Sequence, residues 1–223
     1  MRTGAVARLL ASHGRLPINE VAARLGVAET ALQADARQPD AGIRHLGEWL
    51  IPARLAADDG PAQDDHLTAR RAAAHAALPL IDAGMRLFLD AGTTTPCLAE
   101  ALPALPGLQV LTHSLAVAQI LAARPAIGLT ILSGDYHAAT NAFYPARPDD
   151  RDFAMIDLAF LSAGGIADDG LITCSHMHEV AIKRAAISAA QRRYILADRS
   201  KLDRRRPIPF AMTDEMDGII SEA

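Results

Sequence analysis

Short apolar runs alternate with helical patterns from residue 85 onward. The runs that predict strands are RLFLD (86–90), LQVLT (108–112), LTILSG (129–134), LAFLSAGG (158–165), RYILAD (193–198) and DGIIS (217–221). Apolar residues at helical spacing predict helices over 95–102, 114–124 and 178–191. Strands that alternate with helices indicate an α/β domain, with a mostly parallel sheet covered by helices on both faces. Such sheets bind ligands at the carboxyl ends of their strands.

The beginning of the chain follows a different pattern, which indicates a small helical domain. Helices are predicted over 5–14, 18–26 and 28–38, and Gly26 supplies the turn between the last two. Two helices joined by a short glycine turn are typical of a helix-turn-helix, although many helical hairpins share this pattern.

A segment rich in proline, glycine and aspartate separates the two patterns. The segment IPARLAADDGPAQDDH (51–66) has the composition of a hinge, and an alanine-rich helix is predicted after it over 67–81. The sequence therefore predicts three parts, which are an N-terminal helix-turn-helix domain over 1–52, a linker over 53–66 and an α/β domain over 67–223.

Composition limits the class of protein. The chain has 223 residues and is 50% hydrophobic, but no apolar stretch reaches the roughly 18 residues that a membrane span needs. The N-terminal segment lacks the continuous apolar region of a secretory signal, so Cys97 and Cys174 are expected to be reduced thiols in a cytoplasmic protein without membrane contact. The net charge is −4, so bulk charge does not support nucleic-acid binding.

Lysine usage is strongly biased. Lysine and arginine together number 22, but only Lys183 and Lys201 are lysines. In a chain that uses arginine wherever a positive charge suffices, a lysine indicates a position that needs a compact ammonium on a flexible stem. The alternative is that both lysines are surface residues without a particular role.

The strongest local signal is LDAGTTTP (89–96), which follows the first strand predicted for the α/β domain. Gly92 lets the backbone approach a ligand closely, and the three threonines supply hydroxyl donors without negative charge. The next helix starts within this segment, and free N–H groups at a helix start attract anions. Asp90 would repel a phosphate, so it is expected to accept hydrogen bonds from sugar hydroxyls. A capped helix start without a ligand is the alternative.

Several motifs, in matching order and spacing, resemble the sensor domain of DeoR-type transcriptional regulators. They are GMRLFLDAGTTT (84–95), LTHS (111–114), ILSG (131–134), IDLAFLSAGGIADDGLIT (156–173), EVAIKRAAISAA (179–190) and YILADRSKL (194–202). The resemblance covers about residues 70–220. For the C-terminal domain it implies the fold of sugar-phosphate isomerases and CoA-transferases, and for residues 1–52 it implies a winged helix-turn-helix. It also implies a regulator whose affinity for DNA changes when it binds a phosphorylated sugar or related metabolite.

The resemblance also implies an effector site. The residues expected to bind the effector are Asp90, Gly92, Thr93, Thr94, Thr95, Gly164, Gly165, Glu179, Lys183, Asp198 and Lys201. Both lysines fall on motif positions, where an ammonium beside the threonines would complete a phosphate site by charge-assisted hydrogen bonds. No catalytic residue, metal or cofactor is expected. The substitution Lys183→Ala is expected to abolish the effector response while leaving the fold intact.

Two residues near this site depart from the family's pattern. His113 stands where the family usually has asparagine, and Asp135 follows Gly134 where the family often has a second glycine. Asp135 adds a negative charge near the expected anion site. The sequence therefore does not name the effector.

The predicted recognition helix departs further. Where the family has V-S-x-x-T-I-R-R-D-L, this chain has VAETALQADA (27–36), which lacks the paired arginines that commonly contact phosphates and guanines. The residues expected to contact DNA are Arg24, Glu29, Thr30, Gln33, Arg37 and Arg44. Either these residues read an unusual operator with modest and steeply salt-dependent affinity, or the DNA-binding domain has decayed. We favour the first interpretation.

Two further clusters have alternative interpretations. The segment SHMHE (175–179) could bind zinc on a strand, but it is expected to open a helix, where His176 and His178 do not share a face. The run DRRRP (203–207) is interpreted as a solvated turn rather than a nucleic-acid patch.

Three functions are compatible with the sequence. The favoured one is a transcriptional regulator of carbohydrate metabolism, a repressor rather than an activator, which binds double-stranded operator DNA as a homodimer or homotetramer and is gated by a phosphorylated sugar. The second is an isomerase-type enzyme that uses Asp90, Glu179 or Asp198 as its base. The third is a binding module that has lost its DNA contacts. The N-terminal helices would have no role in an isomerase-type enzyme.

Overall fold

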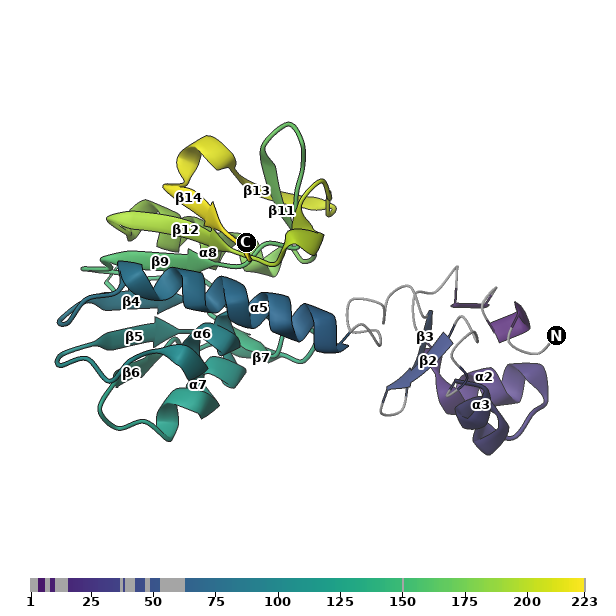
Figure 1. Ribbon diagram of the computed structural model, residues 1–223. Helices are drawn as coiled ribbons and strands as arrows, with labels where there is room; N and C mark the ends of the chain where they lie inside the picture. Colours follow the sequence, from purple (N-terminus) through teal and green to yellow (C-terminus); the bar gives the residue numbers. More distant parts are fainter. Residues whose placement is uncertain are drawn as a thin grey trace. The chain divides into compact units, whose positions relative to one another are not determined.

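The chain folds into two compact units, Met1–Asp64 and Asp65–Ala223 (Figure 1). The computed structural model describes residues 4–6, 9–10, 16–36, 38, 43–46, 49–52, 63–149 and 151–222. None of the helices in these ranges has the length and apolar character needed to cross a membrane.

The N-terminal unit contains helices and a small antiparallel sheet. Helix α2 (Ile18–Leu25) ends at Gly26, whose φ of +65° is left-handed, and α3 (Glu29–Ala36) begins after two more residues. The sheet has the order β1–β3–β2 and is formed by β1 (Leu16–Pro17), β2 (Ile43–Leu46) and β3 (Trp49–Pro52). The helices predicted over 18–26 and 28–38 are therefore present.

Parts of two N-terminal predictions lie outside the described residues. In the helix predicted over 5–14, the described residues are helical, and residues 7–8 and 11–14 are outside the described part. In the linker predicted over 53–66, residues 53–62 are outside it. Helix α5 (Gln63–Ala77) begins four residues earlier than predicted and continues into a 3-10 turn, η1 (Leu78–Leu80).

A six-stranded sheet forms the centre of the C-terminal unit, and every neighbouring pair of its strands is parallel. In sheet order, the strands are β14 (Gly218–Ile220), β12 (Arg192–Leu196), β9 (Leu158–Leu161), β4 (Arg86–Leu89), β5 (Gln109–Thr112) and β6 (Gly128–Ile131). All six predicted strands and the predicted α/β class are confirmed. Because the strands are parallel, their carboxyl ends lie at one edge of the sheet.

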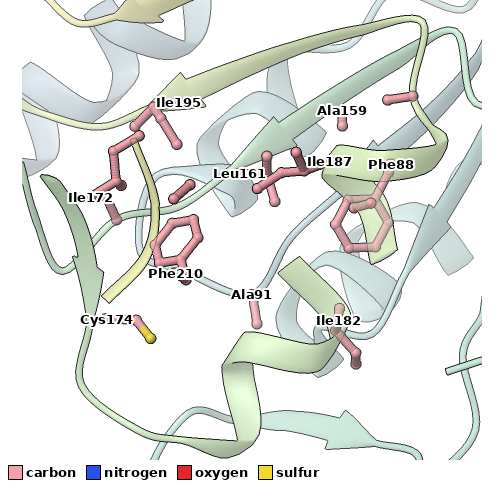
Figure 2. Packing of buried hydrophobic residues seen from close by; sticks show 14 of the residues in the cluster. Phe88, Ala91, Ala159, Leu161, Ile172, Cys174, Ile182, Ile187, Ile195 and Phe210 are labelled. Atoms are coloured by element: carbon pink, nitrogen blue, oxygen red, sulfur yellow. The ribbon is translucent and has the colours of Figure 1, made fainter. Parts of the chain in front are cut away.

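Helices cover both faces of this sheet, as the sequence predicts. Alternate residues of β4 point to opposite faces. Leu87 and Leu89 pack in a core with α5, α6 (Thr95–Ala101) and α7 (Leu115–Ala122). Phe88 packs in the other core with α8 (His178–Ala189), and Figure 2 shows it near Ile182 and Ile187 of that helix.

Two antiparallel elements were not predicted from the sequence. Strands β7 (Asp135–His137) and β8 (Ala142–Tyr144) form a hairpin. A second sheet has the order β10–β11–β13 and consists of β10 (Gly165–Ile166), β11 (Leu171–Cys174) and β13 (Ile208–Met212). The strand predicted over 158–165 therefore ends at Leu161, and only its last position, Gly165, belongs to a strand of the second sheet.

Candidate functional site

Asp90 is fully buried just after β4 and is the centre of a hydrogen-bond network. Its Oδ1 lies 2.9 Å from Nε2 of His113, which follows β5. Its Oδ2 accepts the backbone N–H of Ser162, which follows β9, at 2.8 Å. The Lys183 ammonium of α8 donates to the same Oδ2. The network therefore joins the carboxyl ends of three adjacent strands to α8.

Lys183 is 1% exposed and is held by several acceptors. Its Nζ donates to the carbonyl oxygen of Ser162 at 2.9 Å and lies 3.6 Å from Oε2 of Glu179, one helical turn earlier. Burial by itself would lower the pKa of Lys183, but Asp90 and Glu179 outweigh it and raise this pKa. Burial by itself would raise the pKa of Asp90, but Lys183 and His113 hold it well below its usual value. Lys183 and Asp90 therefore form a charged ion pair.

This ion pair changes the expected result of Lys183→Ala. The substitution would leave the Asp90 carboxylate buried without its principal counter-charge, which is strongly destabilising in proteins. We therefore expect loss of stability as well as loss of any effector response, contrary to the expectation from the sequence.

The threonine turn supports the same network. Thr95 is buried, and its Oγ1 donates to the Asp90 carbonyl at 2.7 Å, so its proton is used inside the protein. Thr94 is buried at the start of α6, and Thr93 is exposed. A Cβ at Gly92 would overlap the Ser162 side chain, so this glycine allows the close packing of two strand ends.

Asp198 and Lys201 form a second cluster, at the end of β12. The Asp198 carboxylate is 1% exposed and accepts from the Ser200 N–H at 3.1 Å and from Nε of Arg70 in α5 at 3.4 Å. Burial by itself would raise the pKa of Asp198, but the Ser200 hydroxyl, Lys201 and Arg70 lower it. The two lysines of the chain therefore lie beside different carboxylates, Lys183 at Asp90 and Lys201 at Asp198.

Gly164 and Gly165 have a packing role in the structure. A Cβ at Gly165 would lie 2.6 Å from the backbone oxygen of Arg204, and a Cβ at Gly164 would lie 2.9 Å from Cγ of Arg206. Both glycines therefore let the second sheet approach the 204–206 segment. This placement does not by itself indicate contact with an effector.

A cluster of aromatic and imidazole rings beside the network was not predicted. The Tyr144 ring at the end of β8 lies 5.0 Å from the His113 ring and 4.4 Å from the His178 ring. The His178 ring lies 4.1 Å from the His137 ring and is stacked on His176 at 5.2 Å. The histidines of SHMHE were the available signal, but no local pattern predicts the hairpin that brings Tyr144 and His137 to them.

The SHMHE segment opens a helix, as predicted, because α8 starts at His178. Within the described ranges, no three His, Cys, Asp or Glu side chains are placed to hold a metal ion.

The residues predicted to contact DNA belong to the N-terminal unit. Glu29 and Thr30 are exposed on the first turn of α3, and Gln33 is half-buried one turn later. The Arg24 guanidinium is exposed on α2 and forms an ion pair with Glu20 at 2.5 Å. Arg44 lies in β2, while Arg37 is outside the described residues.

The chain is similar in sequence and in fold to several known proteins. The family model of the DeoR C terminal sensor domain matches residues 65–223. The deoxyribose operon repressor of Escherichia coli strain K12 is 27% identical over an alignment 230 residues long, which covers 99% of this chain and 89% of that protein. The glycerol-3-phosphate regulon repressor of Haemophilus influenzae is 25% identical over 92% of this chain and 82% of its own length. The eIF2B delta structure from Chaetomium thermophilum has a TM-score of 0.51 at 15% identity, covers 72% of this chain and 58% of that chain, and shows similarity of fold alone.

Proposed function

The chain belongs to the DeoR family, and we propose that it is a transcriptional repressor of carbohydrate metabolism. In this proposal the repressor binds double-stranded operator DNA, and a phosphorylated sugar controls that binding. The observation that carries the proposal is the charged network around Asp90 and Lys183, buried at the strand-end edge of a parallel sheet in the matched domain. The relatives named as repressors of deoxyribose and glycerol-3-phosphate genes support the regulatory class. A repressor of this kind acts in the cytoplasm.

The proposed effector site lies over this network. Thr93 and Thr94 would offer hydroxyl groups to the phosphoryl group, and Asp90 and Lys183 would act beneath them as positioning residues. Lys201 would contribute from the end of β12. The remaining predicted residues, Gly92, Thr95, Gly164, Gly165, Glu179 and Asp198, would shape this edge of the sheet.

The charge states of the candidate bases do not favour an isomerase-type enzyme. Isomerisation of a sugar phosphate needs a carboxylate that can take up a proton. The pKa of Asp90 and the pKa of Asp198 are both lowered, and both carboxylates are occupied by hydrogen bonds within the protein. Glu179 is paired with the Lys183 ammonium. These carboxylates fit a binding site better than general-base catalysis.

The DNA-binding half of the proposal rests on α2, Gly26 and α3 as a helix-turn-helix, with β2 and β3 as its wing. A homodimer or homotetramer would present two such units to the half-sites of an operator. The Arg24–Glu20 ion pair lowers the positive charge available to DNA phosphates, so modest affinity with strong salt dependence is expected.

Replacing Gln33 by alanine is expected to weaken specific DNA binding about 5- to 100-fold, because the amide of glutamine can form two hydrogen bonds with an adenine edge. The measurement is a gel shift of the full chain on its own upstream region, at about 50 mM and about 200 mM salt. Gln109→Ala, on β5 of the other unit, is the matched control and should bind like the wild type. Absence of wild-type binding at both salts would contradict the DNA-binding role and favour a module that has lost its DNA contacts.

A phosphorylated sugar is expected to raise the melting temperature of the protein and to release it from DNA without being converted. Thermal unfolding against a panel of pentose, hexose and polyol phosphates measures the stabilisation. Turnover of any of them would support the enzyme instead. Stabilisation without turnover and with unchanged DNA binding would contradict gating.

A further inference from the structure

Two buried polar atoms beside the network have no hydrogen-bond partner among the described residues. They are the phenolic oxygen of Tyr144 and Nε2 of His178. Tyr144 is only 5% exposed, and its ring lies edge-on to the His178 ring. Burial of such atoms is unfavourable, because each loses its hydrogen bonds to water and gains none from the protein. Two neighbouring atoms of this kind indicate a ligand that supplies the missing partners.

Both groups are uncharged. Burial raises the pKa of Tyr144 far above its usual value, so the phenol keeps its proton. The nearby Thr140 hydroxyl lowers this pKa, but it lies outside hydrogen-bonding geometry with the phenol and donates to the carbonyl of His137 at 3.4 Å. Burial lowers the pKa of His178, and His137 lowers it further, so the imidazole is neutral at neutral pH. A neutral phenol and a neutral imidazole can each donate or accept a hydrogen bond.

A continuous row of rings connects these atoms with the buried ion pair and with the surface. His113, which contacts Asp90, lies edge-on to Tyr144. Tyr144 contacts His137 and His178, and both histidines are partly exposed. The unpaired atoms therefore lie next to the proposed effector site, on the same edge of the sheet.

The chemistry of the cluster favours a neutral ligand group over a metal ion or an anion. The rings of His176 and His178 are stacked within 8° of parallel, so their nitrogens do not converge on one point. The negative charge of Glu179 acts on both Tyr144 and His178 and would repel an anion. A hydroxyl group of a ligand fits this cluster, since it carries no charge and can donate one hydrogen bond while it accepts another.

We propose that Tyr144 and His178 bind hydroxyl groups on the uncharged carbon chain of the effector, and so determine which phosphorylated sugar or polyol is accepted. This inference rests on the proposed function, because it assumes that the phosphoryl group binds at the threonine turn. An analogue without the matching hydroxyl leaves two buried polar atoms unpaired. Sites built in this way discriminate strongly against such analogues.

The substitution Tyr144→Phe tests the proposal, because it removes one oxygen and keeps the ring. The probes are ribose 5-phosphate, glycerol 3-phosphate and inorganic phosphate, each titrated calorimetrically into the full chain. We expect Tyr144→Phe to weaken binding of a hydroxylated phosphate about fivefold or more and to leave inorganic phosphate unaffected. We also expect the melting temperature of the unliganded chain to rise by about 1–3 °C, because an unpaired buried hydroxyl is removed. Tyr136→Phe is the control, since Tyr136 is exposed and donates to Asn141. It should change neither the affinity for the hydroxylated phosphates nor the affinity for inorganic phosphate.

The outcomes separate this inference from the proposed function. If no probe binds the wild-type chain, inorganic phosphate included, the proposed function fails and the inference fails with it. If the probes bind but Tyr144→Phe binds them as tightly as the wild type, only the inference is overturned. It is also overturned if the wild type prefers neither hydroxylated probe to inorganic phosphate, or if unliganded Tyr144→Phe melts at a lower temperature.

Discussion

Lys183→Ala is expected to lower the free energy of unfolding by about 3–5 kcal/mol, because loss of one member of a buried ion pair leaves the other charge unpaired. Asp90 and Lys183 are both buried, and the nearest remaining side-chain partners of Asp90 would be His113 and Ser162. Urea unfolding at neutral pH measures the loss. Lys201→Ala is the matched control, since the other lysine is only partly buried, and it is expected to cost less than about 1 kcal/mol.

The pH dependence of this difference follows from the direction of the pKa shifts. The pKa of Asp90 is lower in the folded state, so its stabilising charge is complete above the unfolded pKa of about 3.9 and is lost as the pH falls further. The pKa of Lys183 is raised, so its contribution is complete below about pH 10.4 and is lost at higher pH. The difference in free energy of unfolding between the wild type and Lys183→Ala should therefore be constant near neutral pH and become smaller in acid. Equal stability of wild type and Lys183→Ala at pH 7 would show that the ion pair is not formed.

Gly134→Ala is expected to cost about 3 kcal/mol or more, because it combines backbone strain with steric overlap. Gly134 has a φ of +154°, which side chains rarely adopt, and a Cβ there would overlap the backbone of Tyr144 and Pro145. The variant must therefore move the β7–β8 hairpin, and with it the Tyr144 ring. Thermal unfolding measures the loss of stability, and titration with ribose 5-phosphate measures the change in ligand binding that follows from the moved Tyr144 ring.

Gly218→Ala is the control for Gly134→Ala. A Cβ at Gly218 would lie 3.5 Å from the Tyr194 ring, an ordinary contact, so the variant should keep most of its stability and its ligand binding. A Gly134→Ala variant as stable as Gly218→Ala would contradict the hairpin geometry described here.

Regular periodicity explains which parts of the fold could be predicted. The six parallel strands are short apolar runs separated by helical patterns, and this signal is local in the sequence. The β7–β8 hairpin has three residues in each strand, several of them polar, and Tyr136 is exposed. Its pairing depends on contacts with His113 and the neighbouring strand ends, which no local pattern contains.

The candidate site was only partly predictable for the same reason. Asp90 and Lys183 were placed together through a family resemblance, although 93 positions separate them in the chain. Ser162 was missed, since a serine after an apolar strand has no distinctive pattern, yet it contacts both. Lys201 lies next to Asp198, which was expected in the same site, and the contact of either residue with an effector stays a prediction. The proposed DNA contacts and effector contacts stay predictions.

The first turns of α5 are attached to the sheet differently from the rest of the helix. The buried residues of α5 among those described are Ala73, Ala74 and Ala77, all in its second half. Ahead of them, Arg70 lies 3.4 Å and His66 lies 3.8 Å from the Asp198 carboxylate. Backbone amides in this part of α5 can therefore exchange with solvent through a local opening that breaks polar contacts at one carboxylate and leaves the apolar core closed.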